Sequence, residues 1–275
     1  MRLKDKLRNV SALVSLLMST ASAYGTSITV QISGTQILFV ADTHEQLLSP
    51  GTQTSNDDFC KIVPLGHAAA AFIGNVHYTP NGVLDLIPSW DTQVDAREAY
   101  TSTSRDLRKT ASEWAEKAKN HYSSLYLAVP ELVTQLAKGN TANILLAGLF
   151  AGYRDGKAML FMQVVSLDET HSLAPIVNQE IVFGPGDLTY PAHPITQELM
   201  EGNSERAKSS QAEWTRKAKS ISMSEQRWRR LEYFIQETAK YDKSVGTRVN
   251  VLEISLDADQ RWLQNSTCPA VSQKP

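Results

Sequence analysis

Four residues near the start of the chain have the types that an N-terminal threonine nucleophile requires: Thr26, Asp42, Lys61 and Gly74. The hydroxyl of Thr26 becomes a nucleophile once a base removes its proton, and a freed α-amine with a pKa of about 8 can be that base. Lys61 would raise the positive potential and favour the neutral amine, while Asp42 would hold Lys61 in place. The N–H of Gly74 could receive the oxyanion. These residues predict an acyl-transfer site.

Two strands must position this set. Ile28, Val30 and Ile32 alternate with polar residues, which is the period of a half-buried strand, and residues 37–41 form a continuous apolar run of strand length. Gly34 supplies a turn between them, so the sequence predicts an antiparallel hairpin that ends at Asp42. After a loop, a run of small residues forms a further strand that stops at Gly74.

The ordered set resembles the proteasome β-subunit family of N-terminal-nucleophile hydrolases. In that family a Gly-Thr junction is cut to expose the threonine, and Gly25–Thr26 matches it. An Ala-Asp step follows sixteen residues after the threonine, as Ala41–Asp42 does here (42 minus 26). A Lys-Ile pair, a short strand and a glycine come next, and Lys61–Ile62 and Gly74 match them, with the lysine slightly later than usual. The resemblance implies an autocatalytic cut before Thr26.

Two positions depart from the family pattern. The family carries an aspartate and a serine in a turn near the threonine amine; Asp242 matches the aspartate, but Val245 stands where the serine is expected. Ser244 is adjacent and could substitute for it. A second family serine lies in a Gly-Ser-Gly turn, where this chain has Pro185 between two glycines.

The order of the expected elements is typical of an α+β protein. A helix is expected over residues 107–125, with Thr103 as its cap, and a second opens at Pro130. Strands then flank an Asp155–Gly156 turn, helical patterns follow, and a closing strand spans residues 249–256. Residues 47–58 are expected to be loop. The resemblance extends this to a four-layer αββα sandwich of two antiparallel sheets between helices, forming a single domain over residues 26–275.

The first 23 residues match a secretory signal peptide: a basic start, a mildly apolar stretch and an Ala21-Ser22-Ala23 cleavage site. The apolar part is too short to span a bilayer, so no stable membrane span is expected. The alternative is a propeptide to residue 25 that only covers Thr26. If the signal is genuine, the protein is exported, either secreted or periplasmic. Cleavage after Ala23 then leaves Tyr24-Gly25 ahead of Thr26, and a second cut is needed.

The composition indicates which kinds of partner and cofactor to expect. The 27 basic and 29 acidic residues give a net charge of −2 without long runs of one sign, so nothing indicates a nucleic-acid partner. The six histidines show no metal-ligand spacing, and neither a metal nor an organic cofactor is expected. Cys60 and Cys268 could pair or remain free thiols. The family often assembles into rings, so a homo-oligomer is an open expectation.

Each site residue also has a simpler explanation. Thr26 could be a polar strand residue, Asp42 a strand end, Lys61 a solvated flank and Gly74 a point of tight backbone approach. The function expected is an N-terminal threonine hydrolase that cleaves a peptide or amide substrate through an acyl-enzyme on Thr26. The alternative is a catalytically inactive proteasome-like subunit with a structural or binding role. The catalytic set expected is Thr26, Asp42, Lys61, Gly74 and Asp242.

Overall fold

The hairpin expected at the start of the domain is present. In the computed structural model, β1 (Ile28–Ile32) pairs antiparallel with β2 (Gln36–Asp42), and Ile28 lies opposite Ala41. The alternating apolar residues of β1 are fully buried. The structure describes residues 26–49, 52–74, 77–78, 88–138, 143–168, 175–177, 180–183, 187–257 and 259–270.

This hairpin lies in the middle of a five-stranded antiparallel sheet. Its strands, in spatial order, are β13 (Leu188–Pro191), β1, β2, β14 (Val249–Ser255) and β15 (Gln260–Gln264). The closing strand predicted over residues 249–256 is therefore confirmed as β14. It pairs with β2, so that Val249 lies opposite Asp42.

A second antiparallel sheet carries the Lys61 end of the site. Its strands, in spatial order, are β11 (Pro175–Val177), β10 (Lys157–Leu167), β9 (Ile144–Arg154), β6 (Ala68–Gly74) and β5 (Ile62–Pro64), with β12 (Ile181–Phe183) also on β10. The Asp155–Gly156 turn joins β9 to β10 as predicted, and both of its residues have positive φ.

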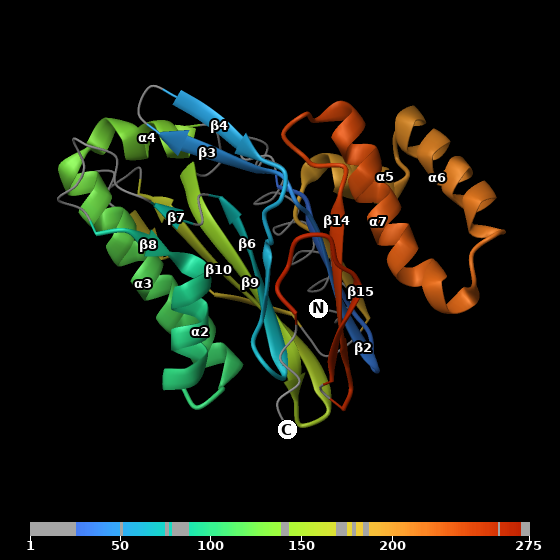
Figure 1. Ribbon diagram of the computed structural model, residues 1–275, viewed down its shortest axis with the longest axis horizontal. Helices are drawn as coiled ribbons and strands as arrows, with labels where there is room; N and C mark the ends of the chain where they lie inside the picture. Colours follow the sequence, from blue (N-terminus) through green and yellow to red (C-terminus); the bar gives the residue numbers. More distant parts are fainter. Residues whose placement is uncertain are drawn as a thin grey trace, which may run out of the picture.

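The two sheets pack face to face, with helices on both outer faces (Figure 1). Apolar side chains of β1 and β2 meet those of β6, β9 and β10 in one buried cluster between the sheets. A second cluster joins the far face of the second sheet to its helices, and a third joins β2 and β14 to α7 (Met223–Tyr241). The mixed α+β class is confirmed, with two antiparallel sheets at its centre.

The helices of the second sheet form one covering layer, which Figure 1 shows in green. They are α2 (Thr92–Ser102), α3 (Leu107–Ala128) and α4 (Pro130–Lys138). Trp114, Ala118 and Tyr122 recur at one-turn spacing on α3 and are fully buried, as the periodicity predicts. Thr103 is not the cap of α3: the Asp106 side chain accepts from Arg108 N and Lys109 N, and Thr103 ends α2 instead.

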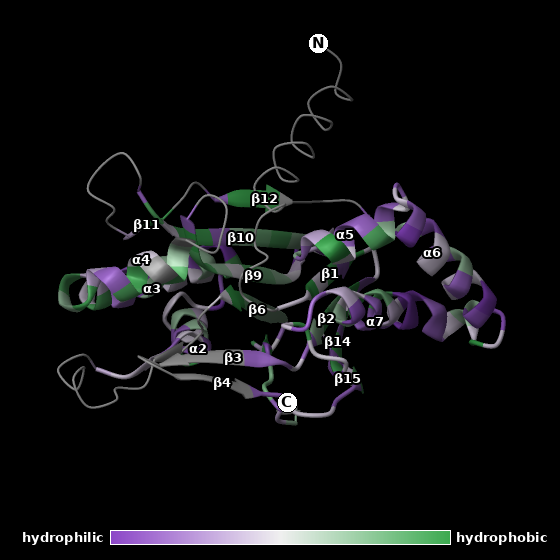
Figure 2. Cartoon of the chain, turned by 90° about the horizontal axis from the view of Figure 1, so that it is seen from above, coloured by the Kyte–Doolittle hydropathy of each residue, from purple (hydrophilic) through white to green (hydrophobic). Residues whose placement is uncertain are grey.

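The helices of the first sheet are α5 (Pro194–Glu201), α6 (Glu205–Ala218) and α7. The face of α7 that contains Trp228, Leu231 and Ile235 packs on the sheet. In the view from above, α6 lies outermost and is largely hydrophilic (Figure 2).

Residues 47–58 are not a loop throughout. β3 (Glu45–Ser49) and β4 (Thr52–Asn56) pair as a separate two-stranded sheet. Residues 52–56 are all polar, so the hydrophobic pattern that reveals other strands is absent here. Another small pair joins β7 (His77–Tyr78) to β8 (Trp90–Asp91), and residues 79–87 between them lie outside the described part.

Candidate active site

The β1–β2 hairpin brings Thr26 and Asp42 together. Because Ile28 lies opposite Ala41, the next step of the ladder places Ser27 beside Asp42. The Asp42 N–H donates to Ser27 O at 3.1 Å, and the Ser27 N–H donates to Asp42 Oδ1 at 2.7 Å. Thr26 immediately precedes this pair and is only 6% exposed. Two residues that are sixteen positions apart in the sequence therefore lie close together at one end of the hairpin.

Asp42 is held by hydrogen bonds to both of its carboxylate oxygens. Oδ1 accepts from Ser27 N and from Lys61 Nζ, the latter at 2.8 Å. Oδ2 accepts from Gly246 N at 2.9 Å and from His44 N at 3.2 Å. The side chain is fully buried, and four donors fix its position.

Lys61 reaches this point from the other sheet. It lies just before β5, is 3% exposed, and places Nζ 3.1 Å from Thr26 Oγ1 as well as on Asp42. Burial lowers the pKa of Lys61 below its usual value, although the carboxylate of Asp42 opposes this shift. A cation that donates to Oγ1 makes the hydroxyl a weaker base and its proton easier to remove. The contact therefore suits an activated nucleophile.

Gly74 has a clear conformational reason to be glycine. Its φ is +110°, and an added Cβ would lie 2.5 Å from the carbonyl oxygen of Leu145 on the facing chain. Gly74 ends β6, the strand that pairs with β5 next to Lys61, and it lies opposite Leu146. Its proposed oxyanion role rests on the resemblance.

Asp242 lies at the C-terminal end of α7, in the turn that leads to β14. Its carboxylate accepts hydrogen bonds from the N–H and the side chain of Ser244, and Oδ2 lies 3.3 Å from His193 Nε2. Burial alone would raise the pKa of Asp242, but the hydrogen bonds from Ser244 and the contact with His193 together lower it. The same turn presents Gly246 N to Asp42, so the two aspartates are linked through one short segment.

The structure describes one of the two positions at which this chain departs from the family pattern. Val245 is buried in the apolar cluster with α7 and β14, where a hydroxyl would not fit the surroundings. Ser244 contacts Asp242 instead, which is the substitution considered above. Pro185 lies outside the described residues.

His193 is a site neighbour that the sequence did not single out. It is 1% exposed and pairs with Asp242, whereas the histidines were considered above only as possible metal ligands. A useful signal was its position before Pro194 at a helix start, because histidine is not a common N-cap residue.

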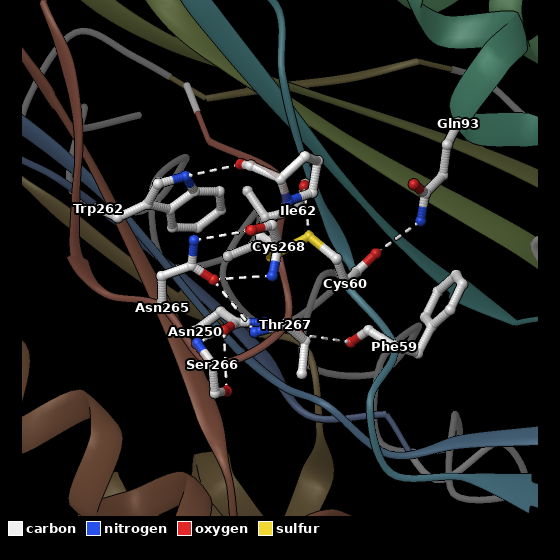
Figure 3. Close-up of a disulfide and its surroundings, with 11 residues drawn as sticks. Phe59, Cys60, Ile62, Gln93, Asn250, Trp262, Asn265, Ser266, Thr267 and Cys268 are labelled. Atoms are coloured by element: carbon white, nitrogen blue, oxygen red, sulfur yellow. Dashed lines mark hydrogen bonds between the residues drawn. A yellow bond between two sulfur atoms is a disulfide. The ribbon is translucent and has the colours of Figure 1, made fainter. Parts of the chain in front are cut away.

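A disulfide lies next to Lys61. Cys60 is bonded to Cys268 in the C-terminal segment that follows β15 (Figure 3). Asn265 Oδ1 accepts from Cys268 N at 2.7 Å, and Asn250 Oδ1 of β14 accepts from Ser266 N at 2.9 Å. The bridge thus ties the chain that carries Lys61 to the sheet that carries Thr26 and Asp42.

Two further features are absent from the described residues. Within those residues, no group of three or more His, Cys, Asp or Glu side chains is arranged to hold a metal ion. None of the helices described there combines the length and the apolar character that crossing a membrane requires.

Comparison of the chain with protein-family models and with curated proteins finds no match.

Proposed function

We propose that this protein is an N-terminal threonine hydrolase, similar to the proteasome β-subunit family, that cleaves peptide or amide bonds through an acyl-enzyme on Thr26. The contact that carries the proposal is the 3.1 Å approach of Lys61 Nζ to Thr26 Oγ1, with Asp42 on the same nitrogen. Thr26, Lys61 and Asp42 are each almost fully buried. Lys61 lies between the other two, so the nucleophile contacts the cation and the cation contacts the carboxylate, as this chemistry requires.

Maturation comes first in the proposed mechanism. The bond between Gly25 and Thr26 must be cut, because the α-amine that serves as base exists only at a chain end. In the autocatalytic version, Thr26 Oγ attacks the carbonyl carbon of Gly25, and the resulting ester is hydrolysed. The products are a chain that begins at Thr26 and a released leader.

The catalytic cycle then uses the same atoms. The amine of Thr26 takes the proton from Oγ as Oγ bonds to the substrate carbonyl carbon, and the N–H of Gly74 stabilises the oxyanion. Collapse of this intermediate breaks the C–N bond, and the departing amine takes the proton from the Thr26 ammonium. Water hydrolyses the ester with the amine again as base. Lys61 stays charged beside Oγ, and Asp42 holds Lys61.

Export from the cytosol is part of the proposal. The Cys60–Cys268 disulfide supports it, because disulfides persist in oxidising compartments and are rare in reducing ones. The signal-like residues 1–23 support it independently.

An inactive relative of the same family is the second candidate. The burial of Val245 at a position where the family carries a serine favours it. An electrophilic inhibitor separates the two candidates: the active enzyme gives a mass adduct on Thr26, and the inactive relative gives none.

The test of activity compares Thr26→Ala with Thr26→Ser on a panel of fluorogenic peptides and simple amides. Removal of Oγ should lower turnover by at least about 10³-fold, because the nucleophile is lost. Serine keeps the hydroxyl and the amine and should retain measurable turnover. Equal turnover by wild type and Thr26→Ala would contradict the proposal.

A further inference from the structure

His193 occupies a helix start without capping it. It is the N-cap residue of α5, yet its side chain makes no hydrogen bond to the first N–H groups of that helix. An N-cap side chain usually accepts such a bond. The imidazole is fully buried and faces Asp242 instead. Its position is therefore set by something other than helix capping.

The two ring nitrogens have different surroundings. Nε2 lies 3.3 Å from Asp242 Oδ2. Nδ1 is buried, and the described structure gives it no hydrogen-bond partner. A buried polar atom left unpaired costs about 1–3 kcal/mol, so such an atom calls for an explanation. A group that arrives only in the mature protein would provide one.

The strand pairing places His193 next to the start of β1. The Ala192 N–H donates to Ile28 O at 2.7 Å, and the next step of this ladder sets His193 across from Ser27, the residue after Thr26. Thr196, one turn further on, shares a hydrogen bond of 2.8 Å with Ser27 Oγ. The beginning of α5 is thus fixed to the segment whose amine the proposed cut would free.

The charges around the ring favour its neutral form. Burial lowers the pKa of His193, and the charge of Lys61 acts in the same direction; Asp242 and Asp42 oppose this without reversing it. Asp242 is a carboxylate with a lowered pKa, so the single ring proton belongs on Nε2, where it can donate to Asp242. Nδ1 then carries a lone pair.

We propose that His193 is a positioning residue whose Nδ1 accepts a hydrogen bond from the Thr26 α-amine after the cut. The proposal rests on the proposed function. The bond uses one N–H of the amine and directs its lone pair toward Oγ. When the amine takes the Oγ proton, the new ammonium charge is stabilised by Nδ1 and, behind it, by the Asp242 carboxylate. His193 forms no covalent bond and transfers no proton.

Two substitutions separate positioning of the amine from support of Asp242. His193→Asn places an amide oxygen near the position of Nδ1 and loses the contact with Asp242. His193→Gln places its amide near the position of Nε2 and loses the acceptor at Nδ1. Positioning predicts that the glutamine variant is the more damaged one, whereas a purely structural role through Asp242 predicts the reverse order.

Two readouts are needed on mature protein. One is kcat and KM for a fluorogenic amide, and the other is the pKa of the Thr26 α-amine, from the pH dependence of its carbamylation by cyanate, followed by mass. His193→Gln should lower kcat by about 10²-fold with little change in KM, the size expected for a misplaced reacting group. It should also lower the amine pKa, because the ammonium loses an acceptor. His193→Asn should recover most of both.

The matched control is His121→Gln. His121 Nε2 lies 2.9 Å from Asp95 Oδ2 in the helix layer of the other sheet, so this variant removes a His–Asp pair away from Thr26. It should leave kcat and the amine pKa unchanged. The inference is overturned if His193→Gln retains both values, or if His193→Asn is the more damaged variant. If Thr26→Ala also keeps full turnover, the proposed function itself fails. If Thr26→Ala loses turnover while the His193 variants change neither kcat nor the amine pKa, the proposed function stands.

Discussion

Asp42 is the residue on which the candidate site depends most. Its carboxylate accepts from three main-chain N–H groups and from Lys61, and every donor except His44 lies at least 15 residues away in sequence. Lys61 donates to Asp42, so loss of this carboxylate would remove a group that directly offsets the buried charge of Lys61. The contact between Lys61 and Thr26 therefore depends on the hydrogen bonds that hold Asp42 in place.

We expect Asp42→Asn to lower the free energy of unfolding by about 3–5 kcal/mol, because an amide N–H would face a donor and Lys61 would lose the carboxylate to which it donates. Urea denaturation measures this. Asp155→Asn is the control: Asp155 lies in a hairpin turn with a side chain 92% exposed and a positive φ that asparagine tolerates. A loss for Asp42→Asn that is no larger than the control would show that the carboxylate is not buried as described.

The pH dependence of stability provides a second prediction for single residues. The folded-state pKa of His193 is lowered from 6.5 by burial, so below that pH the unfolded chain binds more protons than the folded chain. Stability should therefore fall as pH drops through the window below 6.5. For this one group the slope is at most about 1.4 kcal/mol per pH unit.

His193→Asn removes that titration. Comparison of its urea midpoints with those of wild type, at about pH 7 and about pH 5, should show a smaller acid-induced loss for the variant. Parallel losses in the two proteins would mean that His193 is solvated or charged in the folded state.

At the scale of elements, the site is assembled across the two sheets. Thr26 and Asp42 belong to the β1–β2 hairpin, and Lys61 precedes β5 of the other sheet. Relative movement of the sheets would separate Lys61 from Thr26. The Cys60–Cys268 bridge lies one residue from Lys61 and joins its segment to the end of the first sheet, so it opposes that movement (Figure 3).

We expect the double variant Cys60→Ala, Cys268→Ala to lose about 2–5 kcal/mol of stability, because the bridge closes a long loop in the unfolded chain. It should also lose turnover at temperatures where it is still folded, because Lys61 is held less firmly. Thermal unfolding followed by circular dichroism, with and without reductant, measures the first effect. Reductant should lower the melting temperature of wild type and leave that of the double variant unchanged; equal responses would contradict the account.

At the scale of the whole molecule, the regular parts of the fold follow from periodicity. The hairpin of β1 and β2, the helix α3 and the turn at Asp155–Gly156 were all predictable, because each buries an apolar face or needs a specific turn residue. β3 and β4 were not predictable, because β4 is polar throughout. Thr103 was assigned to the wrong helix end because α2, whose apolar pattern is weak, was not foreseen.

The candidate site, like the fold, was predictable only in part. The grouping of Thr26, Asp42 and Lys61 was expected from a resemblance in order and spacing, and the structure places them in contact. Asp242 was expected near the amine, but its neighbour His193 was not. That pair depends on the ladder between β13 and β1 and on the packing of α5 against the end of α7, and β13 itself was not foreseen. Long-range pairing of this kind leaves no local pattern in the sequence.

The mass of the mature protein shows whether Thr26 becomes the N-terminal residue and acts as the nucleophile. Purified protein should be analysed intact, together with Thr26→Ala prepared in the same way. The wild-type chain should begin at Thr26 and gain one adduct at that residue with an electrophilic inhibitor, while Thr26→Ala should keep Gly25 and gain none. A wild-type chain that begins at Tyr24, with no adduct, would contradict the proposed function.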